Sequence, residues 1–224
     1  MTECILLSGN TPAELDHLHE IDANTVHKIF GFEDNKIRLG RIGTIGDGSC
    51  FFHSCCLAMN LHDYASLQAP GRKEIAYKLR SDMSDSLTPS EFEKLGKSSQ
   101  YEEFKDEIRQ PKTWADEKMI KWASKYLNAN IVFINLSNNK NQLFCGVVND
   151  SFLEAVKKCA TRKSEIPTIL IGWIDHSHFE CIVRIDSVND HSVNTTSMFV
   201  PSNKKDLETT IIPMMLAYVT KCSA

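Results

Sequence analysis

The sequence predicts a mixed α+β domain in which helices pack around a small central β-sheet. Apolar residues at helical spacing dominate the chain up to residue 130, and short apolar runs typical of strands follow. Helices in one part of a chain and strands in another favour this class. With 224 residues, of which 42% are hydrophobic and 24% charged, we expect one domain with a buried core.

Five helical segments are predicted along the chain. Residues 11–31 begin with a threonine, a proline and a glutamate at the positions typical of a helix start. Apolar residues recur at three- and four-residue spacing in later segments, which favours helices packed on a core. In the strongly charged stretch 91–109 we expect one or two exposed helices. The remaining segments are 51–59, 75–87, which Pro89 closes, and 113–127.

Four strands are predicted in the second half of the chain. A continuous apolar run at 131–134 is typical of a buried strand, and 143–148 is its expected partner after a polar turn. Residues 168–174 and 179–185 are predicted to be two further strands, joined by the short connection 175–177.

A cysteine follows the Gly-rich acidic turn Gly46–Ser49 and precedes an apolar segment predicted to be a helix. Cys50 is therefore expected at a helix N-terminus, where unpaired N–H groups and the helix dipole favour a thiolate over a thiol. The same N–H groups are suited to holding the oxyanion of an acyl-transfer intermediate. This context indicates a cysteine nucleophile, and a buried structural thiol is the alternative.

Polar residues also gather where the last two predicted strands meet, at His176, His178 and Glu180. Alternate residues of a strand share a face, so His178 and Glu180 are expected side by side. A carboxylate that accepts a hydrogen bond from one imidazole nitrogen fixes the tautomer and raises the basicity of the other nitrogen. We therefore predict that His178 is the general base for Cys50 and that His176 is a loop histidine.

Three blocks of the sequence, Asp47–Phe52, residues 113–132 and His178–Glu180, together resemble the ovarian tumour (OTU) family of deubiquitinating cysteine proteases. Asp47–Phe52, with the sequence DGSCFF, resembles the catalytic cysteine motif of the family, and His178–Glu180 resembles its histidine motif. Residues 113–132 are similar to its middle helix and strand. The three blocks occur in the order of the family.

The resemblance implies an OTU-like cysteine protease fold within a single domain, 1–224. On this basis we expect the catalytic core at about 38–187, with an N-terminal helical extension at 1–37 and a C-terminal extension at 188–224. The implied activity is thiol-dependent hydrolysis of the isopeptide or peptide bond after the C-terminal Gly of ubiquitin or a ubiquitin-like modifier. The expected partners are ubiquitin, polyubiquitin chains or such a modifier, with no cofactor and a monomeric enzyme.

Roles for individual residues also follow from the resemblance. It implies that Cys50 is the nucleophile and that His178 is first the general base and then the general acid. The backbone of Gly48, Ser49 and Cys50 would form the oxyanion hole. Trp114 matches an aromatic position close to the histidine of the family and is expected to line the site, with a core residue as the alternative.

The third member of the triad has three candidates. The family usually carries Asp or Asn two residues after the histidine, and this chain has the longer Glu180. Glu180 is the first choice, with a solvated strand carboxylate as the alternative. Asp47 is the second choice, although it is equally suited to forming the turn. Asp175 is the third.

Composition argues against several other classes of protein. The net charge is −4 and no block of basic residues occurs, so we expect no nucleic-acid binding. No apolar run approaches the roughly 18 to 20 residues of a membrane helix. The N-terminus lacks a signal-peptide pattern. We therefore expect a protein of the cytosol or nucleus, or of a host cytosol if the chain is a viral or bacterial effector.

The cysteines fit neither a disulfide framework nor a metal site. Their scattered spacing favours reduced, buried thiols. Cys50, His53, Cys55 and Cys56 crowd one segment but lack the paired spacing of zinc ligands, so no metal is expected.

The alternative to an active enzyme is a catalytically degenerate OTU-like protein that binds ubiquitin or acts as a scaffold. The departure from the family pattern at Glu180 motivates it.

Overall fold

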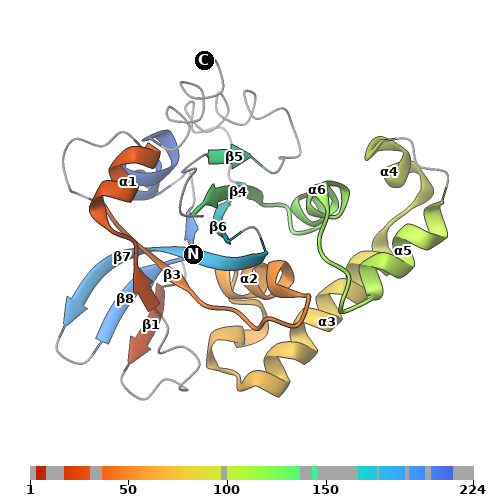
Figure 1. Cartoon of the computed structure of the whole chain (residues 1–224), viewed down its shortest axis with the longest axis horizontal. Coiled ribbons are helices and arrows are strands. Elements are labelled where there is room, and N and C mark those ends of the chain that lie inside the picture. Colours follow the sequence, from red (N-terminus) through yellow and green to blue (C-terminus); the bar gives the residue numbers. More distant parts are fainter. Residues whose placement is uncertain are drawn as a thin grey trace.

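The computed structural model describes residues 4–8, 18–30, 37–96, 100–136, 143–145, 166–175, 177–189, 192–199 and 203–213. In these residues one mixed β-sheet is covered by helices, as Figure 1 shows, and the predicted α+β class is confirmed. None of the helices in the described residues is long and apolar enough to cross a membrane.

The main path of the sheet runs β1-β8-β7-β6-β4-β5, with β3 paired to β7, β2 to β3 and β9 to β6. β4 and β6 are parallel, and the other pairs are antiparallel. The strands are β1 (Cys4–Ser8), β2 (Leu18–Glu20), β3 (Arg38–Ile42), β4 (Asn130–Asn135), β5 (Leu143–Cys145), β6 (Thr168–Ile174), β7 (His178–Asn189), β8 (Ser192–Thr196) and β9 (Met198–Phe199).

Most helices lie between β3 and β4 in the sequence, and Figure 1 shows α3, α4, α5 and α6 on the far side of α2 from β7. The helices are α1 (Ala23–Phe30), α2 (Cys50–Ala58), the 3₁₀ helix η1 (Leu61–Ser66), α3 (Ala69–Ser86), α4 (Pro89–Lys94), α5 (Tyr101–Arg109), α6 (Glu117–Tyr126), α8 (Lys204–Asp206) and the π-helical turn η2 (Leu207–Ile211).

The helices predicted from 51–59, 75–87 and 113–127 are confirmed as α2, α3 and α6. The charged stretch 91–109 contains most of α4 and all of α5, and these helices are less exposed than expected because Phe92 and Phe104 are buried. Pro89 begins α4 as well as ending the previous segment, since the Thr88 side chain accepts the hydrogen bond of the first helical turn.

The helix predicted at 11–31 is wrong over residues 18–22, and residues 11–17 lie outside the described part. Leu18 pairs with Ile42 in a short strand, so the N-terminal extension is not purely helical. The helix starts only at α1, where Asp22 accepts a hydrogen bond from the Thr25 N–H at 3.0 Å. This aspartate occupies the position of an N-cap, which explains why the helix begins there.

The strand predictions at 131–134 and 168–174 are confirmed by β4 and β6, and β5 supplies the start of the strand predicted at 143–148. The polar turn expected between the strands predicted at 131–134 and 143–148 lies outside the described residues. The strand predicted at 179–185 is confirmed by β7, which is longer at both ends.

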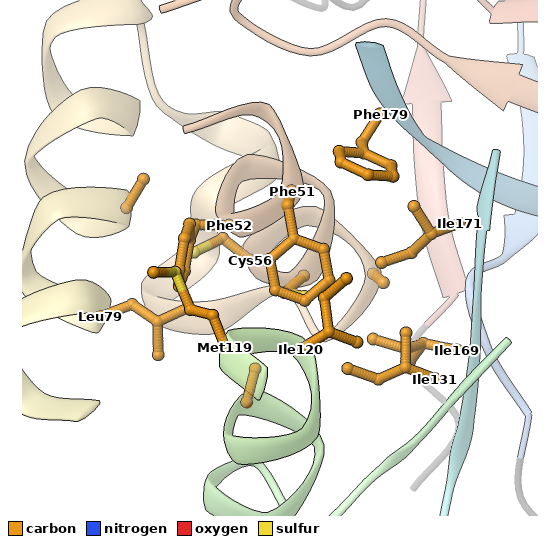
Figure 2. Packing of buried hydrophobic residues seen from close by; sticks show 14 of the residues in the cluster. Phe51, Phe52, Cys56, Leu79, Met119, Ile120, Ile131, Ile169, Ile171 and Phe179 are labelled. Atoms are coloured by element: carbon orange, nitrogen blue, oxygen red, sulfur yellow. The ribbon is translucent and has the colours of Figure 1, made fainter. Parts of the chain in front are cut away.

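α2 is buried on all sides, more than the one apolar face that the sequence predicts. All nine of its residues are buried. Figure 2 shows the reason: Phe51, Phe52 and Cys56 lie between the sheet, α3 and α6. The Phe51 ring stacks on Phe133 of β4, with 6.1 Å between the ring centres. It meets Phe179 of β7 edge-on, with 5.9 Å between the ring centres. The N-terminus of α2 is therefore held against the start of β7.

Both faces of β7 are buried. Phe179, Cys181 and Val183 pack in the cluster that contains α2, and Ile182 packs in a second cluster on the other side of the sheet. The C-terminal segment closes that second side, since Ile211 of η2 is fully buried there.

Candidate active site

Cys50 is the first residue of α2, so the predicted helix start is confirmed. Its side chain is buried, with 6% of the residue exposed. The turn that precedes it passes through Gly48 with φ +89°, a conformation that favours glycine. A Cβ on Gly48 would lie 2.8 Å from the Lys112 Cα and 3.0 Å from the Pro111 carbonyl oxygen. The glycine therefore permits both the turn and its close contact with residues 111–112.

Ser49 and Arg80 fasten this turn to the segment after α5. The Ser49 hydroxyl donates to the Pro111 carbonyl at 2.8 Å, and an Arg80 nitrogen donates to the Ser49 hydroxyl at 3.3 Å. Arg80 is fully buried, with its guanidinium 4.3 Å from the centre of the Phe52 ring. The guanidinium also donates to four carbonyls, those of Glu107 at 3.1 Å, Ile108 at 2.7 Å, Gln110, and Thr113 at 3.0 Å.

Burial lowers the pKa of Arg80 to about 10, so the side chain still carries its charge at neutral pH. A single buried cation thus supports the chain before Cys50 and the 107–113 segment beside it. Local sequence does not predict this role, because an arginine next to Leu79 in a helix is ordinarily exposed.

Asp47 supports the same turn from the other side. Its carboxylate accepts hydrogen bonds from the Ser49 N–H at 2.9 Å, the Tyr77 hydroxyl at 3.0 Å and His53 Nε2 at 3.2 Å. Burial alone would raise the pKa of Asp47, but the Ser49 N–H and the neighbouring His53 outweigh it and lower the pKa. Asp47 is therefore ionised, and the structure does not bring it to His178.

His53 is a fully buried part of this network that the sequence analysis considered only as a metal ligand. Burial lowers its pKa, although the Asp47 carboxylate opposes the shift. Its Nδ1 lies 2.6 Å from the Tyr64 hydroxyl. Since a carboxylate only accepts, Nε2 carries the proton and Nδ1 accepts from Tyr64. The neutral imidazole thus connects the Asp47 turn to η1.

The start of β7 lies next to Cys50 because β3 ends early. Ile42, the last residue of β3, pairs with Cys181. His178 and Phe179 therefore extend beyond β3, where the segment that leads into α2 passes. The Phe179 backbone lies close enough to the Cys50 thiol to influence its pKa, and Phe51, the next residue of α2, packs on the Phe179 ring. The thiol therefore lies near the peptide that follows His178.

The pKa of the Cys50 thiol is raised rather than lowered. Burial is the largest cause, and the charge of Asp47 adds to it. Backbone hydrogen bonds from Phe179, Phe51 and Cys50 itself oppose the shift without reversing it. The helix start favours the thiolate as expected, but desolvation is stronger, so Cys50 is a neutral thiol at rest.

His178 is half-buried at the first position of β7. Among the described residues, the hydrogen-bond partner of its ring is Thr44, whose Oγ1 lies 3.4 Å from Nε2. The Thr44 hydroxyl also donates to the Phe179 carbonyl at 2.6 Å. Thr44 was missed by the sequence analysis because nothing local connects it to a histidine 134 residues away.

Glu180 is buried and paired with Arg41 of β3, whose guanidinium donates to the carboxylate at 2.7 Å. The carboxylate is not within hydrogen-bonding distance of His178 in the described structure. Asp175 is exposed, in a left-handed turn with φ +46°. The position of His176 lies outside the described residues. Cys50 and His178 therefore lie near the same end of β7, and among the described residues no carboxylate is hydrogen-bonded to the imidazole.

Trp114 is 55% exposed, so the alternative of a core residue is excluded. It follows Thr113, whose carbonyl accepts a hydrogen bond from Arg80. Trp114 therefore belongs to the segment that Arg80 connects to the Gly48 turn. This exposure leaves its ring available to a ligand.

In the part of the chain that the structure describes, no group of three or more His, Cys, Asp or Glu side chains is arranged to hold a metal ion. Cys50, Cys55, Cys56 and Cys181 are free thiols. Burial raises the pKa of Cys56 to about 12, which keeps that thiol neutral.

The site thus combines a cysteine at the N-terminus of a buried helix with a histidine at the start of a neighbouring strand. Comparison with protein families identifies the chain further. Residues 45–164, more than half of the chain, match the model of the OTU-like cysteine proteases. The chain belongs to this family.

Solved structures of OTU domains are also similar to the chain. A structure of an OTU domain in complex with ubiquitin is 14% identical, with 85% of this chain and 91% of that chain covered and a TM-score of 0.46. The Hazara virus OTU bound to ubiquitin is 10% identical, covering 77% and 99%, with a TM-score of 0.41. An OTU deubiquitinase from Wolbachia pipientis wMel bound to ubiquitin is 17% identical, covering 64% and 94%, with a TM-score of 0.40. A search of curated proteins gives no match.

Proposed function

We propose that this protein is a cysteine-type deubiquitinase that hydrolyses the bond after the C-terminal Gly of ubiquitin or a ubiquitin-like modifier. The observation that carries the proposal is the placement of Cys50: it begins a buried helix, follows a turn held by Asp47 and Arg80, and lies at the strand start that carries His178. The substrate class rests on the family to which the chain belongs.

His178 acts as the general base. Because the Cys50 thiol is neutral at rest, its proton moves to the imidazole as the sulfur attacks the carbonyl carbon of the terminal glycine. The attack gives a tetrahedral oxyanion, and its collapse transfers the proton from His178 to the leaving amine. Water then hydrolyses the thioester, with His178 again as the base.

The oxyanion is held by the backbone of the turn. The N–H of Ser49 already donates to Asp47, so of the three predicted donors we assign the role to Gly48 and Cys50. The Cys50 N–H belongs to the first turn of α2 and has no backbone carbonyl to accept it within the helix. The helix dipole adds positive potential at the same place.

Trp114 is proposed to line the approach to Cys50, because it is exposed on the segment fastened to the Gly48 turn. A flat aromatic surface suits the two glycines that end the ubiquitin tail, since they carry no side chains. Of the three carboxylates predicted for the third position, Glu180 is the nearest to His178 in the sequence, but it is paired with Arg41. Its carboxylate would have to leave Arg41 to act there.

The second candidate function is a degenerate OTU-like protein that binds ubiquitin without cleaving it. The observation that favours it is the absence of a carboxylate on the His178 ring among the described residues, together with the raised pKa of Cys50. Such a protein would still hold the ubiquitin tail at the turn before α2.

The two functions are separated by turnover of a fluorogenic amide at the C-terminus of ubiquitin, followed by a panel of di-ubiquitins and ubiquitin-like fusions. We expect cleavage by the wild type and none by Cys50→Ala or His178→Ala. Binding of ubiquitin without cleavage of any substrate in the panel would reject the enzyme in favour of the binding protein.

A further inference from the structure

One hydroxyl, that of Thr44, bridges the imidazole of His178 and the backbone carbonyl next to it. Oγ1 lies 3.4 Å from His178 Nε2 and 2.6 Å from the Phe179 carbonyl oxygen. Thr44 belongs to the segment that leads from β3 to Cys50, so one short stretch of chain places both the hydroxyl and the thiol at the start of β7.

The two contacts fix the direction of both hydrogen bonds. A carbonyl oxygen only accepts, so the single hydroxyl proton of Thr44 is given to Phe179. Toward His178, Oγ1 then has only lone pairs to offer. The proton of the neutral imidazole must therefore be on Nε2, and Nδ1 is left as the basic nitrogen.

We propose that Thr44 is the positioning residue of the site: it holds His178 in the Nε2–H tautomer and leaves Nδ1 to accept the proton of Cys50. This assignment rests on the proposed function. Neither of the first two carboxylates predicted for the task is on the ring, since Glu180 pairs with Arg41 and Asp47 is held by the turn.

A neutral hydroxyl has a different consequence from a carboxylate. It orients the ring without stabilising the imidazolium by a full charge, so the proton of Cys50 is not drawn to His178 before the substrate arrives. During attack, Nδ1 takes the thiol proton while Nε2–H continues to donate to Thr44. Nδ1 then returns that proton to the leaving amine, and the imidazole is neutral again.

The kinetic test compares Thr44→Val, which keeps the shape and removes the hydroxyl, with Thr44→Ser, which restores it. On the fluorogenic ubiquitin amide we expect Thr44→Val to lower kcat about three- to tenfold, the range of one neutral hydrogen bond, with KM changed less than about twofold. Thr44→Ser should recover most of kcat. Thr209→Val is the matched control, because the Thr209 hydroxyl also donates to a carbonyl at 2.6 Å, that of Lys205 in the C-terminal segment.

The second readout is the tautomer itself, measured from the imidazole ¹⁵N shifts of the full chain carrying Cys50→Ala, with His178→Gln to assign the signal. We expect the Nε2–H tautomer, and a larger Nδ1–H fraction when Thr44→Val is added. An Nδ1–H tautomer in the presence of Thr44, or an unchanged kcat in Thr44→Val, would overturn the proposal. If the wild type cleaves no ubiquitin substrate, the proposed function fails, and the tautomer alone decides the role of Thr44.

Discussion

Arg41 and Glu180 form a cross-strand ion pair between β3 and β7, with the guanidinium donating to the carboxylate at 2.7 Å. The carboxylate of Glu180 is therefore bound to Arg41 of the neighbouring strand and not to His178, which lies two residues earlier in β7. The residue that the sequence predicts as the third triad member thus has a structural partner of its own.

Replacing Glu180 by Gln tests that predicted role. The amide oxygen can still accept from Arg41, so the ion pair becomes a hydrogen bond and the strand pairing is kept. We expect kcat within about threefold of the wild type, because Thr44 orients the ring. A loss of several tens-fold or more, the size typical of a triad carboxylate, would return the role to Glu180.

Gly48 and Gly46 offer a matched pair in the turn before Cys50. Gly48→Ala should lower the free energy of unfolding by more than about 1 kcal/mol, from the positive φ alone, and displace the turn because the new Cβ meets backbone at 2.8 Å. Gly46→Ala should change little, since a Cβ there meets nothing within 4 Å. Chemical denaturation and turnover of both variants check this; equal effects in the two would contradict it.

Arg80 is predicted to be the most sensitive cation of the helical layer. Arg80→Met leaves the carbonyls of the 107–113 segment without their buried donor, and we expect a loss of about 3 kcal/mol or more in the free energy of unfolding. Arg109→Met is the control, because its ion pairs with Asp85 and Asp106 are exposed and should contribute nothing measurable. A stable Arg80→Met protein would show that the segment is held by other contacts.

The reactivity of Cys50 with iodoacetamide should depend on pH in the manner of a raised pKa. Only the thiolate reacts, and a pKa above the ordinary value of 9.0 makes the thiolate scarcer at pH 7 than in a free cysteine. We therefore expect the alkylation rate at Cys50, followed by peptide mass mapping, to be slow at pH 7 and still rising above pH 9. A plateau below pH 7 would instead indicate a thiolate–imidazolium pair in the resting site.

Local signals in the sequence were sufficient for the main features of the site. The Gly-rich turn followed by an apolar run placed Cys50 at a helix start, and the alternation of polar and apolar residues placed His178 at the head of a strand. Each of these depends on a few neighbouring residues. The buried strand at 131–134 could also be predicted, because strands covered on both faces are apolar throughout.

The features that were missed depend on contacts between distant parts of the chain. Arg80 reaches carbonyls 27 to 33 residues away, and Thr44 reaches a strand 134 residues away, so no periodicity reveals either. The strand at Leu18 exists because β3 offers a partner, which overrides the helical spacing of the sequence. The raised pKa of Cys50 likewise follows from burial of all of α2, which only tertiary packing determines.

The central claim is that Cys50 is the nucleophile of a deubiquitinase. It is tested most directly with ubiquitin that carries a thiol-reactive group at its C-terminus, incubated with the full chain and analysed by intact mass and peptide mapping. The account predicts one covalent ubiquitin per chain, attached at Cys50, and none on Cys50→Ala. No adduct at any concentration, or an adduct on another cysteine, would contradict it.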